Sequence, residues 1–393
     1  MIRTLFVDDE PDVLEALENR LRRLRRRWSM TFAVGGREAL ARLASEPFDV
    51  IVSDMRMPGM DGIELLSHVR SAYPHMVRIV LSGQTSKEQA FRTLSVAHQF
   101  LSKPCDAPTL VQSVERFRVL EARLASPAVR GLTGVQSLPT VPTLYAELSA
   151  SLDSGASFER IGELVAKDPA VTARLLQVAN SPFFGAVREV EDVRAAVAYL
   201  GTEAVRAVVL SEGLWSAVDI AATVPAFSFD AVQAHSLHAA RLVSQLAPSP
   251  EVARAAFSAA LLHDIGSLVL AMGNSDFYPR ALAEAETSGI CLEQAERWAH
   301  GVSHAEVGAA LLAIWGIPYS IVEGVAYHHR PRDSQEHELG VVGVVHLADW
   351  LAHGAGSDPG ALRAPLDTVF VERLGIRNQV EEWRRTLTSG EVT

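Results

Sequence analysis

The sequence of 393 residues is poor in cysteine and lacks any long hydrophobic run. Its two cysteines, Cys105 and Cys291, are too few for a disulfide framework, which favours a reducing compartment. No stretch approaches about 18 uninterrupted apolar residues, and the segment Met1–Asp9 does not follow the pattern of a signal peptide. We therefore expect a cytoplasmic protein that is not inserted in a membrane.

An excess of positive charge is also missing. The 47 acidic side chains outnumber the 36 lysines and arginines, and the formal net charge is −11. Such a charge disfavours non-specific binding to nucleic acid or to anionic membranes. Six arginines between Arg20 and Arg27 are a local exception. Because they end a helical stretch, predicted over Asp12–Arg27, that begins with acids, we interpret them as a solvated helix C-terminus rather than a nucleic-acid site.

The composition is that of a folded protein, with 48% apolar and 21% charged residues. A chain of this length favours two domains, each with its own core. The first is predicted from short apolar runs that alternate with helical stretches, a pattern typical of a doubly wound α/β fold with a five-stranded parallel sheet. The five predicted strands are Thr4–Val7, Met30–Val34, Val50–Ser53, Arg78–Ser82 and Gln99–Ser102.

Polar residues stand at or just after the ends of these strands. They are Asp8, Asp9, Asp54, Ser82 and Lys103. Because parallel strands present their carboxyl ends at one edge, we expect these side chains to lie together. Clustered carboxylates favour a hard cation with oxygen ligands, such as Mg²⁺, and a carboxylate beside it can act as a nucleophile toward phosphorus. The lysine and the hydroxyl would then bind phosphoryl oxygens.

The segments that carry this pattern resemble the receiver domain of two-component response regulators. They are Phe6-Val-Asp-Asp-Glu10, Ser53-Asp-Met-Arg-Met-Pro-Gly-Met-Asp-Gly62, Leu81-Ser-Gly83 and Phe100-Leu-Ser-Lys-Pro104. The resemblance implies that Asp54 accepts a phosphoryl group from a sensor histidine kinase. It implies that Asp8 and Asp9 hold Mg²⁺ together with Asp54. It also assigns phosphate sensing to Ser82 and Lys103, and the aromatic switch position to Phe100.

A connecting helix is predicted from Ala107 to about residue 126. Its apolar residues recur at steps near three and four, at Leu110, Val114, Phe117 and Leu124. This stripe fits packing on the sheet followed by a linker, and it fits equally well a seam between two copies in a homodimer. We place the receiver domain at 1–122, a helical linker at 123–130 and the output domain at 131–393.

The output domain is predicted to be all-helical and contains most of the histidines. Ten of the 13 histidines lie between Gln233 and His353. A helix predicted to end at Gly266 carries two adjacent ligand types, a histidine and an aspartate. Helices that approach one another would form a mixed nitrogen and oxygen site suited to Fe, Mn, Zn or Ni. The candidate ligands are His235, His263, Asp264, His304, His328, His329 and Asp349.

Three segments of this half resemble the HDOD domain, a signalling output module distantly related to HD-domain phosphohydrolases. They are Leu138-Pro-Thr-Val-Pro142, the run from Lys167 to Gly185, and Ala196-Val-Ala-Tyr-Leu-Gly201. The resemblance covers about residues 131–335. It implies an output that acts through protein contacts, with a partner that the sequence does not name.

The histidine order also resembles the metal site of HD phosphohydrolases and of HD-GYP cyclic-di-GMP phosphodiesterases. The resemblance implies a minimal metal site of His235, His263, Asp264 and Asp349, and a second metal at His304, His328 and His329. His238, one helical turn after His235, is a rival for the first ligand. The sequence departs from the phosphodiesterases at Ser267, where they have a basic residue. It also lacks a Gly-Tyr-Pro segment after His329.

The sequence therefore predicts a phosphorylation-controlled response regulator whose HDOD domain acts on protein partners. The alternative is a receiver-regulated, metal-dependent phosphohydrolase acting on cyclic dinucleotides or nucleotides. DNA binding is not expected, because the helix–Gly201–helix segment lacks a cluster of basic residues. A covalent serine hydrolase is not expected either, because no Gly-x-Ser-x-Gly segment occurs.

Overall fold

The computed structural model describes residues 1–73, 76–82, 96–103, 105, 107–111, 113–115, 142–181, 184, 188–213, 228–273, 277–354 and 365–388. The chain divides into two compact units, formed mainly by residues 1–136 and 137–393. The predicted linker at 123–130 and the stripe residues Phe117 and Leu124 lie outside the described residues. The exact domain boundaries given above therefore stay predictions.

The N-terminal unit contains one parallel sheet of five strands in the order β2-β1-β3-β4-β5. The predicted fold class is confirmed. The strands β1 and β3 include the polar residue at their end, because Asp8 and Asp54 still pair in the ladder, and β1, β2 and β4 begin one or two residues earlier than predicted. The strands are β1 Ile2–Asp8, β2 Trp28–Val34, β3 Val50–Asp54, β4 Val77–Ser82 and β5 Gln99–Ser102.

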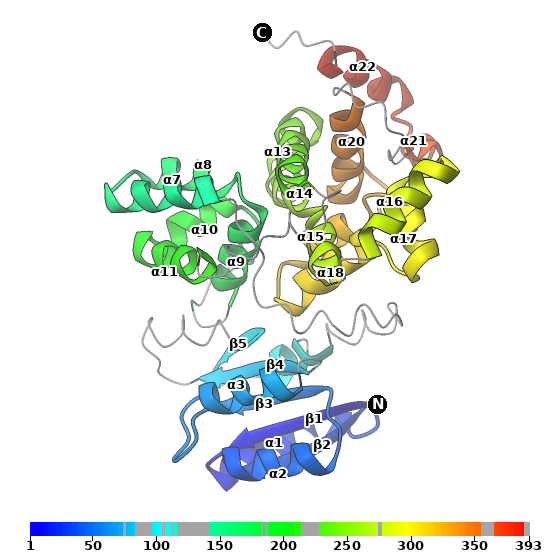
Figure 1. Ribbon diagram of the computed structural model, residues 1–393. Helices are drawn as coiled ribbons and strands as arrows, with labels where there is room; N and C mark the ends of the chain where they lie inside the picture. Colours follow the sequence, from blue (N-terminus) through cyan, green and yellow to red (C-terminus); the bar gives the residue numbers. More distant parts are fainter. Residues whose placement is uncertain are drawn as a thin grey trace. The chain divides into compact units, whose positions relative to one another are not determined.

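Helices cover both faces of this sheet. Leu14, Leu17 and Leu21 of α1 (Pro11–Leu21) pack in one cluster with Phe6, Val52 and Ile79 of the strands. Leu110 and Val114, on the helical residues 107–111 and 113–115, join the same cluster. The helices α2 (Gly36–Ser45) and α3 (Gly62–Ala72) contact each other and pack on β1, β2 and β3 (Figure 1).

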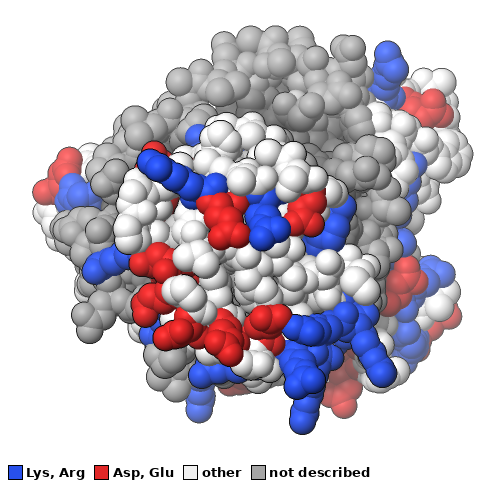
Figure 2. Space-filling model, turned by 90° about the horizontal axis from the view of Figure 1, so that it is seen from below, with Lys and Arg blue, Asp and Glu red and all other residues white. Residues whose placement is uncertain are grey.

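The predicted helix Asp12–Arg27 is too long. The helix α1 ends at Leu21 and is followed by a short 3-10 helix, η1, at Arg22–Leu24. The chain has to turn here because Trp28, which is only 1% exposed, starts β2 in the core. Arg25 pairs with Glu18, and Arg27 with Glu115. Figure 2 shows blue basic and red acidic side chains in neighbouring groups on one face, so this surface is not uniformly basic.

The C-terminal unit is helical throughout its described residues, as predicted. Two sets of helices can be distinguished by their contacts: α7 to α11 pack mainly on one another, and α13, α14, α19 and α20 form a second group (Figure 1). The helices are α7 Pro142–Asp153, α8 Phe158–Val165, α9 Pro169–Ala179, α10 Val193–Leu200, α11 Thr202–Gly213, α13 Phe229–Leu246, α14 Pro250–Leu262, α15 Ile265–Gly273, α16 Phe277–Ser288, α17 Leu292–His300, α18 His304–Ile314, α19 Tyr319–Tyr327, η3 Pro331–Asp333, α20 Val341–Gly354, α21 Thr368–Leu374 and α22 Arg377–Thr388.

Among the described residues one helical stretch, Pro250–Ala271, is long and apolar enough to cross a membrane, but 72% of its most apolar window is buried inside the structure. Burial of this kind is what the central helix of a folded domain shows. The same stretch contains the His263-Asp264 pair, so its apolar residues form the packing that surrounds a polar cluster.

Candidate functional site

The carboxyl edge of the sheet brings together three of the predicted receiver residues. Asp8 ends β1 and Asp54 ends β3, which is the neighbouring strand. The ammonium group of Lys103, directly after β5, lies 2.7 Å from Asp8 Oδ2 and also forms an ion pair with Asp54. Both carboxylates are buried, at 1% and 6% exposure, so this lysine supplies their positive charge within the protein.

The environment of Lys103 keeps it charged. Burial alone would lower the pKa of Lys103, but hydrogen bonds and charges of Asp54 and Asp8 outweigh burial and raise it above the usual 10.5. Asp9 follows Asp8 and is half-buried beside the edge. The set of buried, oxygen-only donors fits a hard divalent cation, and Asp8, Asp9 and Asp54 are the residues that would hold Mg²⁺.

The backbone around Asp54 leaves no room for a larger residue at Gly62. A Cβ atom on Gly62 would lie 2.2 Å from the Asp54 carbonyl oxygen. The Gly62 N–H donates to the Met55 carbonyl at 2.8 Å, which holds the start of α3 against the end of β3. The Arg56 N–H donates to Asp54 Oδ2 at 2.7 Å and fixes the orientation of that carboxylate.

For Ser82 and Phe100 the structure describes only the backbone. Ser82 is the last residue of β4 and is in register with Ser102 of β5, while Phe100 pairs with Val80. The side chains of Ser82 and Phe100 lie outside the part of the structure that is described. Their assigned roles in phosphate sensing and switching stay predictions.

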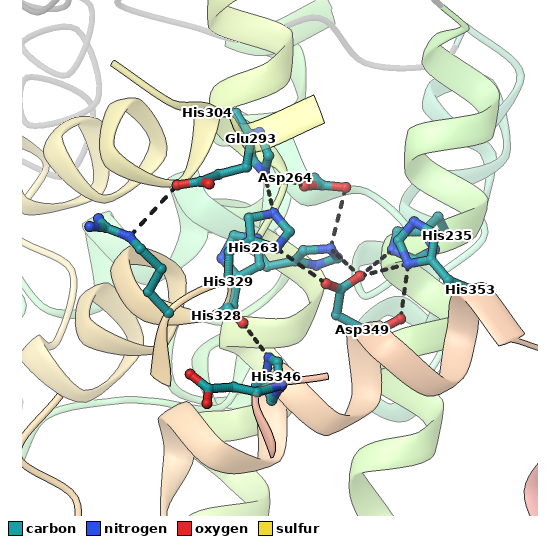
Figure 3. Close-up of polar contacts among 12 residues, drawn as sticks. His235, His263, Asp264, Glu293, His304, His328, His329, His346, Asp349 and His353 are labelled. Carbon is teal, nitrogen blue, oxygen red and sulfur yellow. Dashed lines mark hydrogen bonds and ion pairs between the residues drawn. The ribbon is translucent and has the colours of Figure 1, made fainter. Parts of the chain in front are cut away.

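In the helical unit all seven predicted ligands lie in one connected cluster (Figure 3). They come from five places in the fold: α13, the turn between α14 and α15, the start of α18, the end of α19, and α20. His235 Nε2 lies 2.9 Å from Asp349 Oδ1, whereas no ion pair joins the rival His238 to a carboxylate of the cluster among the described residues. His235 lies about one turn before His238 on α13, on the face of the helix that is directed toward α20.

Two carboxylates connect the histidines. Asp264 lies 3.3 Å from His263 Nε2 and 3.2 Å from His304 Nε2, through different oxygens. Asp349 Oδ1 lies 3.6 Å from His263 Nε2, and Asp349 Oδ2 lies 3.8 Å from His329 Nδ1. The cluster is buried, because His263, His304 and His328 are at most 3% exposed.

The hydrogen bonds determine which ring nitrogen faces the centre. His263 Nδ1 donates to the Ala260 carbonyl at 2.6 Å, and His328 Nδ1 donates to the Val325 carbonyl at 2.7 Å. A carbonyl can only accept, so Nδ1 carries a hydrogen in each ring and Nε2 is the nitrogen that faces the cluster. Both Nε2 atoms are buried and have no hydrogen-bond partner among the described residues. Histidines that bind metals are oriented in this way.

His304 is oriented by a residue that sequence reasoning did not select. Glu296 of α17 is fully buried, and its Oε2 accepts from the His304 backbone N–H and pairs with Nδ1, each at 2.7 Å. Burial would lower the pKa of His304, but the charge and hydrogen bond of Glu296 outweigh burial and raise it to about 9. No spacing rule connects Glu296 to His304, so only the fold reveals the pair.

The electrostatics of the other members favour a cation at the centre. Burial and the nearby His263 lower the pKa of His328 to about 3, so this ring is neutral. Burial would raise the pKa of Asp349, but hydrogen bonds from His235 and His353 outweigh it and hold that pKa well below its usual value. The neutral imidazole of His328 beside ionised carboxylates fits a divalent transition metal.

The predicted helix end at Gly266 is wrong. The helix α14 ends at Leu262, His263 and Asp264 form the turn, and Gly266 lies inside α15. A glycine is needed there because a Cβ atom on residue 266 would lie 2.0 Å from the His304 carbonyl oxygen. Gly266 therefore permits the close approach of two helices, which brings His263-Asp264 next to His304.

Sequence reasoning also missed His353. It lies one turn after Asp349 on α20, and its Nδ1 lies 3.0 Å from both Oδ1 and the backbone carbonyl of Asp349. Its ring is 4.1 Å from that of His235. The spacing of four residues between Asp349 and His353 was a signal in the sequence, because it places both on one face of a helix.

Comparisons with known proteins agree with this arrangement of an α/β unit followed by a helical unit. The response regulator receiver domain family matches residues 4–115, and the HDOD domain family matches residues 138–331. Asp349 and His353 lie beyond the second match. The chain belongs to the response regulators that join an N-terminal receiver domain to a C-terminal HDOD domain.

Similar curated proteins include the hydrogenase transcriptional regulatory protein HoxA of Cupriavidus necator, 32% identical over 40% of this chain and 32% of its own length. The response regulator protein PilR of Pseudomonas aeruginosa is 31% identical over 42% of this chain and 39% of its own. The chain thus spans about a third of the length of these relatives. Among solved structures, the MmoQ response regulator of Methylococcus capsulatus is 26% identical, with a TM-score of 0.48, over 64% of this chain and 98% of that one.

Proposed function

We propose that this protein is a two-component response regulator that is controlled by phosphorylation of Asp54 and acts through its HDOD domain. The single observation that carries the input half is the ion pairing of Lys103 with both Asp8 and Asp54 at one edge of the sheet. Receiver domains usually bind Mg²⁺ and usually work with sensor kinases, so a histidine kinase is the expected phosphoryl donor.

The chemistry follows from the positions of the side chains. Mg²⁺, when bound by Asp8, Asp9 and Asp54, would offset the repulsion between the carboxylates and the incoming phosphoryl group. Asp54 is the nucleophile, and the Arg56 N–H orients it through Oδ2. A phosphoryl group on Asp54 adds charge and acceptor oxygens, and Lys103 is within reach to pair with them. The change in the position of Lys103 is the switch that the rest of the unit would sense.

Phosphorylation is tested by incubating the full-length protein with a small phosphoryl donor and Mg²⁺. The parent protein should be labelled and Asp54→Asn should not. Asp49→Asn is a matched control, because Asp49 directly precedes the same strand at its opposite end and pairs with Arg3. Equal labelling of the parent and Asp54→Asn would refute the assignment of Asp54.

For the output, we propose that the HDOD domain contacts another signalling protein. We also propose that the response regulator itself is located in the cytoplasm. The match to the HDOD domain supports this proposal. A pull-down with the parent, Asp54→Asn and the phosphorylated form tests whether an output partner is held in a phosphorylation-dependent manner. A homodimer through the predicted helix at 107–126 is a further expectation. Analytical ultracentrifugation of the unphosphorylated and phosphorylated protein would test it.

We also propose that the histidine cluster binds Fe, Mn, Zn or Ni. The Nε2 atoms of His263 and His328 support this proposal, because both are buried and have no hydrogen-bond partner among the described residues. Metal content of the purified protein, compared with His263→Ala and Asp349→Ala, tests it. The parent should retain metal and both variants should lose most of it. A parent that binds no transition metal would contradict the proposal.

Phosphohydrolase activity is the second candidate function, and the same convergence of ligands is the only observation that favours it. A bound metal would supply Lewis-acid activation of a phosphoryl group. Recognition of a cyclic dinucleotide is not supported, because Ser267 is buried inside α15 where the phosphodiesterases carry a basic residue. Assays on cyclic dinucleotides and nucleotides with the metal-loaded parent and His263→Ala would decide between binding and hydrolysis.

A further inference from the structure

The more exposed end of the histidine cluster contains a third group of side chains that could bind a metal. His235, Asp349 and His353 each offer one ligand atom, and these atoms lie within 4.8 Å of one another. We propose that His353 completes a separate metal-binding position with His235 and Asp349, in addition to the positions at His263-Asp264 and at His304, His328 and His329. This inference rests on the proposed metal binding of the cluster.

His353 is oriented in the same way as two of the inner histidines. His263, His328 and His353 each direct Nδ1 at a carbonyl of their own helix, three or four residues earlier. Because the carbonyl accepts, Nδ1 carries a hydrogen in each ring, which leaves Nε2 as the nitrogen that a metal can take. In His353 the Nδ1 hydrogen is shared between this carbonyl and Asp349 Oδ1, each 3.0 Å away. The shared arrangement therefore indicates a ligand.

The number of nitrogen ligands also favours a separate position. His235 offers one nitrogen toward the cluster, so it can serve one metal at a time. Its ring is 4.1 Å from that of His353 and 5.2 Å from that of His263. Asp349 can be shared, because its two oxygens face different neighbours: Oδ1 faces His235 and Oδ2 faces His329. A carboxylate that bridges two positions is a common feature of sites with several metals.

Exposure distinguishes the outer position from the inner ones. The side chains of His353 and His235 are 34% and 18% exposed, whereas those of His263 and His304 are 1% and 4% exposed. A metal held by two partly exposed histidines and a shared carboxylate should exchange faster than one enclosed by buried ligands. We therefore assign the outer position to the most readily exchanged metal of the cluster.

The test is equilibrium dialysis of the full-length protein against Co²⁺, with bound metal counted by mass spectrometry and followed by visible absorption. The parent should bind about one Co²⁺ per chain more than His353→Ala and His353→Gln. The extra Co²⁺ should be the first to leave on dialysis against a chelator. His337→Ala is the matched control, because His337 is exposed and has no contact with the cluster among the described residues.

The outcomes separate this inference from the proposed function. Equal Co²⁺ counts in the parent and both His353 variants, with loss of Co²⁺ in His263→Ala, would overturn the inference and leave metal binding intact. A weaker affinity for every Co²⁺ with no change in the count would also overturn it, since His353 would then only position Asp349. A parent that binds no Co²⁺ would overturn both proposals. Unfolding temperatures of the variants exclude loss of the fold as the cause.

Discussion

Gly266 lies against the backbone of His304, so closely that a Cβ atom on Gly266 would be 2.0 Å from the His304 carbonyl oxygen. The same Cβ atom would be 2.6 Å from the backbone nitrogen of Gly308. Two glycines, one on α15 and one on α18, thus allow the helices to meet at backbone distance. This contact sets the separation between Asp264 and His304.

The first prediction concerns this contact. Gly266→Ala should destabilise the protein by about 3 kcal/mol or more, because the added methyl group meets backbone atoms that cannot rotate away. Metal affinity should fall as well, because α18 would carry His304 away from Asp264. Chemical unfolding and Co²⁺ titration measure the two effects. Gly162→Ala is the control: its Cβ atom would lie 3.3 Å from the flexible side chain of Arg194, so a small effect is expected.

The second prediction concerns Glu296. Glu296→Gln removes the carboxylate that pairs with His304 Nδ1 and should weaken metal binding about 10–100-fold, the usual effect of losing a partner behind a ligand. Co²⁺ titration is the measurement. Glu293→Gln, on the same helix, changes a carboxylate that pairs with Arg297 instead of a histidine. Similar losses in both variants would show that α17 acts through its packing and not through the pairing with His304.

The third prediction concerns the charge balance at the sheet edge. Lys103→Met leaves the buried Asp8 and Asp54 without their ammonium partner and should cost about 2–3 kcal/mol without Mg²⁺. This is a modest value for a buried pair because the Lys103 side chain is 26% exposed. Mg²⁺ should raise the unfolding temperature of the variant more than that of the parent, because the cation then supplies the missing charge. Equal Mg²⁺ shifts would argue against a shared site.

The fourth prediction concerns pH and the cap of α21. Burial would raise the pKa of Asp367, but the hydrogen bonds of Arg332 and the Phe370 N–H outweigh it and lower the pKa below its usual 3.8. A carboxylate with a lowered pKa stabilises the fold above its unfolded-state value, and this contribution is lost as the pH falls through its lower folded-state value.

Asn can still accept from the Phe370 N–H, but it loses the charge pairing with Arg332, so Asp367→Asn should be less stable than the parent by about 0.5–1 kcal/mol at pH 7. The difference should shrink as the pH falls below 3.8. Acid unfolding of both proteins is the measurement. Asp333→Asn is the control, because Asp333 is exposed and pairs with Arg330 at the surface. A difference between parent and Asp367→Asn that stays constant with pH would contradict this account.

The sequence predicted the receiver-like fold well. The five strands were placed within one or two residues because each apolar run is short and bounded by turn residues, as at Val50–Asp54. Helix ends were less well predicted. The run to Arg27 has good helical propensity, but burial of Trp28 in the sheet ends α1 six residues earlier. The sequence predicts a helix end at Gly266, because it does not show that α18 lies against this residue.

By itself, the sequence determined which side chains meet at the edge of the sheet. Parallel strands share one carboxyl edge, so the order of strands and acids was enough to bring Asp8, Asp54 and Lys103 together. The tertiary structure alone decided the composition of the helical site. Helices that are far apart in the chain meet at rotations and distances that no local pattern specifies, and these selected His235 over His238, added Glu296 and brought in His353.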